Sequence, residues 1–186
     1  MPETPLSMFS LSTPTRRQLI TAGALAVGAM RIGSAAGIAA VDNDVTHAAE
    51  AIHQEPLITA SSERIYRVLT NAKLFEKLTR LSAAFKDMAN KHEPAMLDGR
   101  AGGAFALFGG YITGRFVELV PNERVVQAWR AASWDPGVYS IARFQLVEQS
   151  PGTKIIFDHA GFPIGQAEHL AKGWQANYWD PLRQLL

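Results

Sequence analysis

The spacing of apolar side chains divides the chain into segments of different type. Residues 51–58 have the mixed pattern of an edge strand, where Pro56 is tolerated because its missing N–H costs nothing. Between residues 61 and 88 apolar side chains recur every three or four positions, which is typical of amphipathic helices. Ser61 or Ser62 can cap the first helix, and Pro94 closes the region. This part of the sequence predicts a strand followed by two helices.

From residue 99 onward the pattern is that of short strands rich in Phe, Val, Ile and Tyr. The predicted strands lie near residues 104–108, 111–120, 124–132, 138–148 and 153–160. Turn-forming residues such as Gly109 and Gly110 separate them, and connections this short join antiparallel neighbours. We therefore expect residues 99–160 to form an antiparallel meander.

Helical spacing returns from about residue 166 to residue 186. One stripe of this helix carries Leu170, Trp174, Asn177, Tyr178 and Leu182. Pro181 should kink the helix, because proline removes one backbone hydrogen bond. Gly173 would let the helix approach the sheet closely. An antiparallel sheet covered by helices predicts the α+β fold class.

Alternation along the strands predicts which side chains face this helix. The candidate ligand-cavity residues are Ile112, Phe116, Gln127, Trp129, Phe144, Phe157, His159, Trp174 and Tyr178. Many aromatic rings with a few polar groups suit a concave pocket. The same side chains could instead fill an ordinary core, with Gln127 and His159 as satisfied polar groups or pointing outward. The residues alone leave both interpretations open.

The amino-terminal segment has the order of an export signal. Arg16 and Arg17 precede a mildly apolar run from Leu19 to Met30, and a stretch of small residues follows. The run is too short to span a bilayer, which takes about 20 residues. The arginine pair and the glycine-containing run after it resemble a twin-arginine signal. A general secretory signal and an uncleaved anchor are the alternatives.

This interpretation divides the chain into three parts. We expect a signal peptide at residues 1–40, a short tether at 41–48 and one domain at 49–186. Cleavage could follow Ala36, Ala39 or Ala40. The processed protein would be periplasmic or secreted and would keep no stable membrane span.

Composition excludes several kinds of chemistry. The chain has 186 residues, a formal charge of +1 and no cysteine. Nucleic acid is not an expected partner, and disulfides and thiolate metal sites are excluded. The five histidines lack metal-binding spacing, and neither a nucleotide-binding glycine motif nor a nucleophile elbow occurs. We therefore expect no metal, no cofactor and no defined catalysis. His159 could act as an acid–base group, although a lone inward histidine is more often structural.

Several blocks resemble the family of activator of heat-shock protein 90 ATPase homologues, part of the START-like superfamily that includes birch-pollen-allergen proteins. The blocks are residues 114–130, 133–140, 152–154, 161–163 and 173–182. The resemblance covers essentially the whole predicted domain, more loosely at residues 50–100. It implies a helix-grip fold, in which a curved antiparallel sheet wraps around a long carboxyl-terminal helix. Most of the matching residues account for turns and packing, so the blocks are chiefly a signature of the fold.

The expected function is binding of an apolar or amphipathic small molecule outside the cytosol. Chaperone regulation, which the family name implies, is an alternative that we expect less. The eukaryotic activators have a further amino-terminal domain, and this sequence has an export-like segment in that place. An enzyme of the same superfamily is the third alternative, since some members orient a reactive substrate in their cavity.

Overall fold

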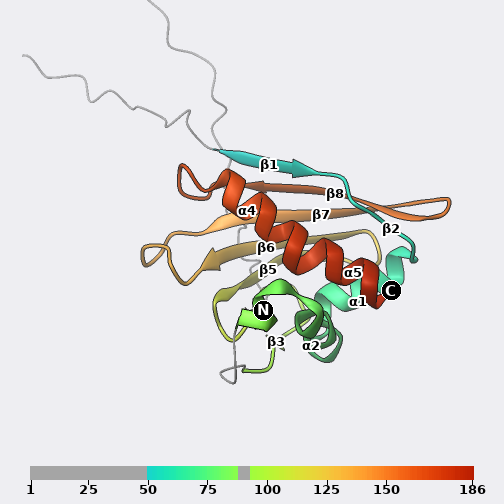
Figure 1. Cartoon of the computed structure of the whole chain (residues 1–186), viewed down its shortest axis with the longest axis horizontal. Coiled ribbons are helices and arrows are strands. Elements are labelled where there is room, and N and C mark those ends of the chain that lie inside the picture. The colour runs from blue at the N-terminus through green and yellow to red at the C-terminus, as the bar shows by residue number, and fades with distance from the viewer. Residues whose placement is uncertain (1–49, 88–92) are drawn as a thin grey trace, which may run out of the picture. The chain divides into compact units, whose positions relative to one another are not determined.

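The computed structural model describes residues 50–87 and 93–186. In these residues a single antiparallel sheet of eight strands runs in the order β1-β8-β7-β6-β5-β4-β3, with β2 also paired to β8 (Figure 1). The strands are β1 (Ala51–Gln54), β2 (Leu57–Ile58), β3 (Met96–Leu97), β4 (Ala104–Leu107), β5 (Ile112–Val120), β6 (Arg124–Ala131), β7 (Ser140–Gln149) and β8 (Gly152–Ala160). Neighbours from β3 to β8 are consecutive in the chain, which confirms the predicted meander.

The first edge strand is shorter than predicted. Pro56 divides the expected strand at residues 51–58 into β1 and β2, both antiparallel to β8. Proline has no N–H to donate to the ladder, but the carbonyl oxygen of Pro56 still accepts from the N–H of Ile155 at 2.9 Å. At the other edge, β3 is a two-residue strand that the sequence pattern did not indicate.

Polar side chains define the ends of the helices between β2 and β3. These helices are α1 (Ser62–Thr70), α2 (Ala72–Leu81) and α3 (Ala83–Asp87). Ser61 is the cap of α1, since its hydroxyl accepts from the N–H of Arg64 at 3.4 Å. The expected second helix is divided at Ser82, whose hydroxyl donates to the carbonyl of Thr79 at 2.6 Å.

The carboxyl-terminal helix lies across one face of the sheet (Figure 1). It consists of α4 (Ala167–Trp174), a π-helical turn η1 (Gln175–Trp179) and α5 (Asp180–Leu185). The widened turn ends two residues before Pro181, which cannot donate to the carbonyl four residues earlier. In an α-helix, two side chains five positions apart differ in direction by more than a third of a turn and so point to different faces. A π turn has more residues per turn, so it brings two such side chains close together. The rings of Trp174 and Trp179 are accordingly stacked, with centroids 5.9 Å apart.

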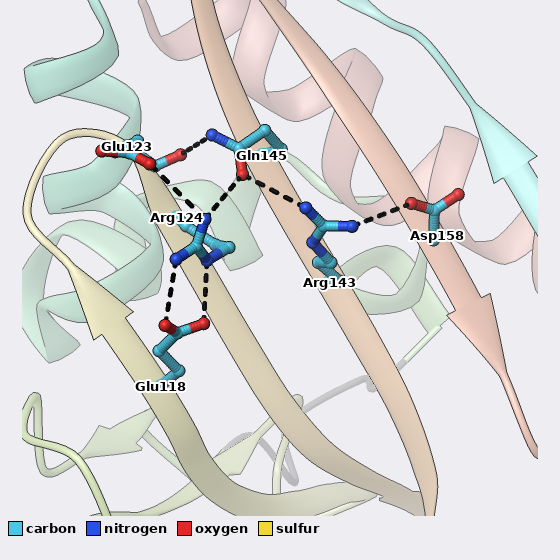
Figure 2. Close-up of polar contacts among 6 residues, drawn as sticks. All are labelled: Glu118, Glu123, Arg124, Arg143, Gln145 and Asp158. Atoms are coloured by element: carbon cyan, nitrogen blue, oxygen red, sulfur yellow. Dashed lines mark hydrogen bonds and ion pairs between the residues drawn. The ribbon is translucent and has the colours of Figure 1, made fainter.

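The two faces of the sheet have opposite character. All the inward positions predicted by alternation are buried on the face toward the helix. On the outer face Arg124 makes a bidentate ion pair with Glu118, at 2.8 and 3.0 Å (Figure 2). The amide oxygen of Gln145 accepts from both Arg124 and Arg143. These charged side chains are therefore paired with polar neighbours at the surface.

Candidate ligand-binding site

A cavity of about 340 Å³ lies between the carboxyl-terminal helix and the sheet. Its walls come from α3, the β4–β5 connection, β5, β6, α4 and η1. The lining residues are Ala84, Phe108, Tyr111, Ile112, Trp129, His169, Leu170, Gly173, Trp174, Asn177 and Tyr178. Tyr111 and His169 are exposed, so the cavity reaches the surface beside them. The buried part of the lining is almost entirely apolar and aromatic.

Four of the nine predicted cavity residues line this space: Ile112, Trp129, Trp174 and Tyr178. The other five, Phe116, Gln127, Phe144, Phe157 and His159, are buried but do not line it. The rings of Trp174 and Trp179 pack directly on Phe144 and Phe157, at centroid distances of 4.4–6.1 Å. The helix therefore fills the space over β7 and β8, and the cavity is left beside the β4–β5 connection, β5 and β6.

Phe108 is a wall residue that the sequence pattern did not single out. It stands at the end of β4 with φ +51°, a left-handed conformation that bulky residues rarely adopt. Gly109 and Gly110 follow with φ +64° and +82°, so the chain reverses tightly here. This turn places the Phe108 ring 5.7 Å from Phe75 and 5.5 Å from Tyr178. The double glycine was a visible signal of the turn but not of the ring's direction.

Asn177 joins two walls of the cavity. Its side-chain oxygen accepts from the N–H of Ala84 at 2.8 Å, and its amide nitrogen donates to the carbonyl of Gly173 at 3.0 Å. The first bond connects α3 to η1 and the second lies within the terminal helix. The side chain thereby satisfies its own polar atoms and keeps the α3 wall against the helix.

The expected role of Gly173 is wrong. Apart from its two chain neighbours and the nearby backbone of its own helix, no heavy atom lies within 4 Å of where a Cβ at this position would be. The residue therefore does not bring the helix close to the sheet. It faces open space on the lining of the cavity, so a larger side chain here would extend into that space.

His159 connects the sheet to the terminal helix. The indole N–H of Trp174 donates to Nδ1 of His159 at 3.0 Å, and Nε2 lies 2.7 Å from the hydroxyl of Ser140. That hydroxyl donates its hydrogen to the carbonyl of Trp129 at 3.0 Å. Nε2 must therefore carry the imidazole proton, and Nδ1 is the acceptor. Both ring nitrogens are used, and burial lowers the pKa of His159 to about 4. These contacts indicate that His159 holds the indole of Trp174 in place.

Two side chains of the lining each have a fully buried polar atom without a hydrogen-bond partner, namely the hydroxyl of Tyr178 and the indole N–H of Trp129. Burial raises the pKa of the Tyr178 hydroxyl above its usual range, which keeps it protonated. The indole of Trp129 is close enough to oppose this rise, but the two groups are not in hydrogen-bonding geometry.

The expectations about metal sites and membrane spans can be compared only with the described residues. No cluster of three potential metal ligands occurs among residues 50–87 and 93–186. None of the helices in these same residues is long and apolar enough to cross a membrane. The arginines predicted to form the export signal, Arg16 and Arg17, lie outside the described residues.

Comparison with known proteins agrees with this geometry. The human "Activator of 90 kDa heat shock protein ATPase homolog 1" is 29% identical over 124 residues, which are 67% of this chain and 33% of that protein. An uncharacterized Schizosaccharomyces pombe protein is 31% identical over 134 residues, 67% of this chain and 40% of the relative. An HSP90 activator from Plasmodium falciparum has a similar fold, with a TM-score of 0.60 at 23% identity, covering 74% of this chain and 94% of that one.

A curved antiparallel sheet gripping a carboxyl-terminal helix defines an α+β protein of the START-like helix-grip class. The chain belongs to the family of activator of Hsp90 ATPase homolog 1-like proteins, whose model matches residues 59–186. It spans about a third of the length of the human relative.

Proposed function

We propose that this protein binds an apolar or amphipathic small molecule in the cavity beneath its carboxyl-terminal helix. The observation that carries the proposal is the cavity itself, whose volume of about 340 Å³ falls in the range of ligand pockets. Its buried walls are mainly aromatic and aliphatic, so transfer of an apolar ligand from water is favourable. The exposed residues Tyr111 and His169 mark its entrance.

Filling the cavity from Gly173 tests this function. We expect Gly173→Leu to weaken binding of the neutral dye N-phenyl-1-naphthylamine at least about tenfold, because the new side chain occupies ligand space. Gly173→Ala is the matched control: it adds one methyl group and should retain binding. It should also raise the free energy of unfolding by about 0.5–1 kcal/mol, since alanine is the better helix former. Dye fluorescence gives the affinity and urea unfolding gives the stability.

Two results of this experiment would contradict the proposal. One is the absence of measurable dye binding to the wild-type protein. The other is equal affinity of the wild-type protein and the folded Gly173→Leu variant, which would place the dye elsewhere. Native mass spectrometry of protein purified from its own cells would then identify any ligand that copurifies.

We also propose that the protein works outside the cytosol after twin-arginine export. The support is the sequence order of Arg16 and Arg17, an apolar run and small residues. A signal of this kind exports proteins that are already folded, which suits a binding protein with a preformed cavity.

Replacing the arginine pair by lysines tests export. We expect the full chain, expressed with a carboxyl-terminal tag in a bacterium that has this pathway, to appear in the periplasm with a new terminus after Ala36, Ala39 or Ala40. The double variant Arg16→Lys, Arg17→Lys should stay in the cytoplasm at full length. Amino-terminal sequencing of both fractions gives the answer. A periplasmic protein that starts at Met1, or equal export of the variant, would argue against this route.

Chaperone regulation is the second candidate, and the names of the relatives favour it. The human relative matches this chain over only about a third of its own length, so its activity need not reside in the shared part. Stimulation of a purified chaperone's ATPase by this chain, equal in the wild-type and Gly173→Leu proteins, would favour regulation over ligand binding.

A further inference from the structure

A surface groove of about 250 Å³ lies between α1, α2 and the end of α5. Here α2 packs against both α1 and α5, at the carboxyl-terminal end of the chain (Figure 1). The groove is separate from the cavity under the terminal helix, because the two share no lining residue. Four aliphatic and three basic side chains line it: Arg64, Arg67, Val68, Leu74, Lys77, Leu185 and Leu186.

Helical spacing gives this groove an apolar floor and a basic rim. Side chains three or four positions apart lie on one face of a helix. On α1 this spacing places Arg64 one turn from Arg67 and Val68, and on α2 it places Lys77 one turn from Leu74. The three basic side chains are exposed, whereas Val68 is buried and Leu74 is half-buried. The positive charges therefore lie at the surface beside aliphatic side chains.

The basic side chains of the groove lack the counter-charges that most basic side chains of the described residues have. Arg124 and Lys172, for example, lie 2.8 and 2.6 Å from the carboxylates with which they pair. Within residues 50–87 and 93–186, the side chains of Arg64, Arg67 and Lys77 form no hydrogen bond and no ion pair. They are therefore free to bind an external anion.

The positive charge of this groove is not balanced by nearby carboxylates. The lining includes no aspartate or glutamate, and the α-carboxylate of Leu186 forms no ion pair with the described basic groups. Glu63 is four positions from Arg67 on α1 but makes no ion pair with it in the described structure. Like charges one helical turn apart repel each other, so Arg64 and Arg67 would be stabilised by a bound anion. The groove should attract negatively charged partners.

We propose that this groove binds an acidic segment of a partner protein. Aliphatic side chains of the segment lie on the groove floor, and its carboxylates pair with Arg64, Arg67 and Lys77. Guanidinium groups bind carboxylates through two parallel hydrogen bonds, and arginine clusters are a recurring means of recognising acidic segments. The proposal goes beyond the binding of a small molecule, since it concerns a different part of the surface.

The lining favours a peptide over other anions. A simple anion such as phosphate would make no use of the aliphatic floor, whereas burial of apolar peptide side chains there is favourable. The lining has no aromatic ring on which nucleic-acid bases could stack. A concave groove also fits a chain segment better than it fits the surface of a bilayer.

Fluorescence anisotropy with matched peptides tests this proposal. The probe is a short labelled peptide in which leucines alternate with pairs of glutamates. One control peptide has glutamines in place of the glutamates, and the other has serines in place of the leucines. We expect the wild-type protein to bind the probe at least about tenfold more tightly than either control. Because the basic side chains are exposed, binding should also weaken about threefold or more when salt rises from about 50 to about 300 mM.

Charge reversal assigns the binding to the groove. Arg67→Glu should weaken binding of the probe at least about tenfold. Lys172→Glu is the matched control and should keep the affinity within about twofold, because it makes the same change in net charge at an exposed position of α4 outside the groove. The milder double variant Arg64→Gln, Arg67→Gln should also weaken binding, and circular dichroism checks that each variant is folded. In NMR the methyl resonances of Val68 and Leu185 should shift with the probe and not with the serine peptide.

Each outcome supports or overturns a stated part of the proposal. Equal binding of the glutamate and glutamine peptides, or unchanged affinity in Arg67→Glu, would overturn the requirement for acidic residues. Equal binding of the serine peptide would overturn the role of the aliphatic floor. Binding to phosphatidylglycerol vesicles without binding to the probe would overturn the peptide in favour of a membrane surface. Unchanged probe affinity in Gly173→Leu, together with unchanged dye affinity in Arg67→Glu, would support two separate sites, so either proposal can fail alone.

Discussion

Replacing Trp174 by alanine should lower the free energy of unfolding by about 3–5 kcal/mol. The indole is 2% exposed and packs against rings from the sheet and from its own helix, including Phe157 at 4.4 Å and Tyr178 at 4.2 Å. Its loss would enlarge the existing cavity and remove the donor to His159. A domain is usually stable by about 5–15 kcal/mol, so this single change would remove a large share. Urea unfolding followed by circular dichroism measures the loss.

Trp174→Phe distinguishes ring packing from the hydrogen bond. Phenylalanine keeps an aromatic ring but cannot donate to His159, so we expect a smaller loss of about 1–3 kcal/mol. Because Trp174 lines the cavity, both variants should also change the affinity for the neutral dye. A loss below about 1 kcal/mol in Trp174→Ala would show that the helix does not pack on the sheet in this way.

The sequence was sufficient to predict the sheet and its buried face, because strand alternation has a short and unambiguous period. Phe116 in β5, Phe144 in β7 and Phe157 in β8 were all predicted to face inward, and all three are fully buried. The same alternation put His159 among the inward candidates, and the structure buries it completely. The blocks at residues 114–130 and 173–182 also indicated the family correctly, because turn and packing residues at fixed spacing specify this fold.

The position of the cavity was not predictable from the same pattern. Periodicity shows which side chains face inward, but not which of them meet a partner across the interior. The π turn before Pro181 brings Trp179 onto the buried side and fills the space over Phe144 and Phe157. The left-handed backbone of Phe108 places its ring in the wall of the cavity, on the side away from Phe144 and Phe157. Both are local departures from regular geometry, so a reading based on regular spacing misses them.

The stability of this protein should fall as the pH drops from about 6.5 to 4, because His159 must stay neutral in the folded state. Its folded pKa of about 4 is below the ordinary histidine value of 6.5, so the unfolded chain binds more protons across this interval. The stabilisation is complete above about pH 6.5 and is lost progressively on acidification toward pH 4. Converted at 1.36 kcal/mol per pKa unit, the loss reaches about 3 kcal/mol.

The cause of this expected pH dependence lies in the contacts of the imidazole. Its Nδ1 faces the indole N–H of Trp174, so protonation there would set two donors against each other. The rings around it are Trp129, Phe157, Phe162 and Trp174, none of which carries a charge to stabilise an imidazolium. The cost of burying the charge is therefore not offset by an ion pair.

His159→Asn isolates this titration from the other ionisable groups. Asparagine does not titrate, and its side-chain oxygen can still accept from the indole of Trp174. The exposed His53 has a raised pKa because it hydrogen-bonds Asp158, so its contribution to the pH dependence of stability has the opposite sign. This contribution is the same in the wild-type protein and the variant and cancels when the two are compared. The wild-type protein should be more stable than His159→Asn at neutral pH, and this difference in unfolding free energy should narrow on acidification. Urea titration from pH 4 to 7.5 measures it. A constant difference would mean that His159 titrates normally and is not the neutral acceptor that holds Trp174.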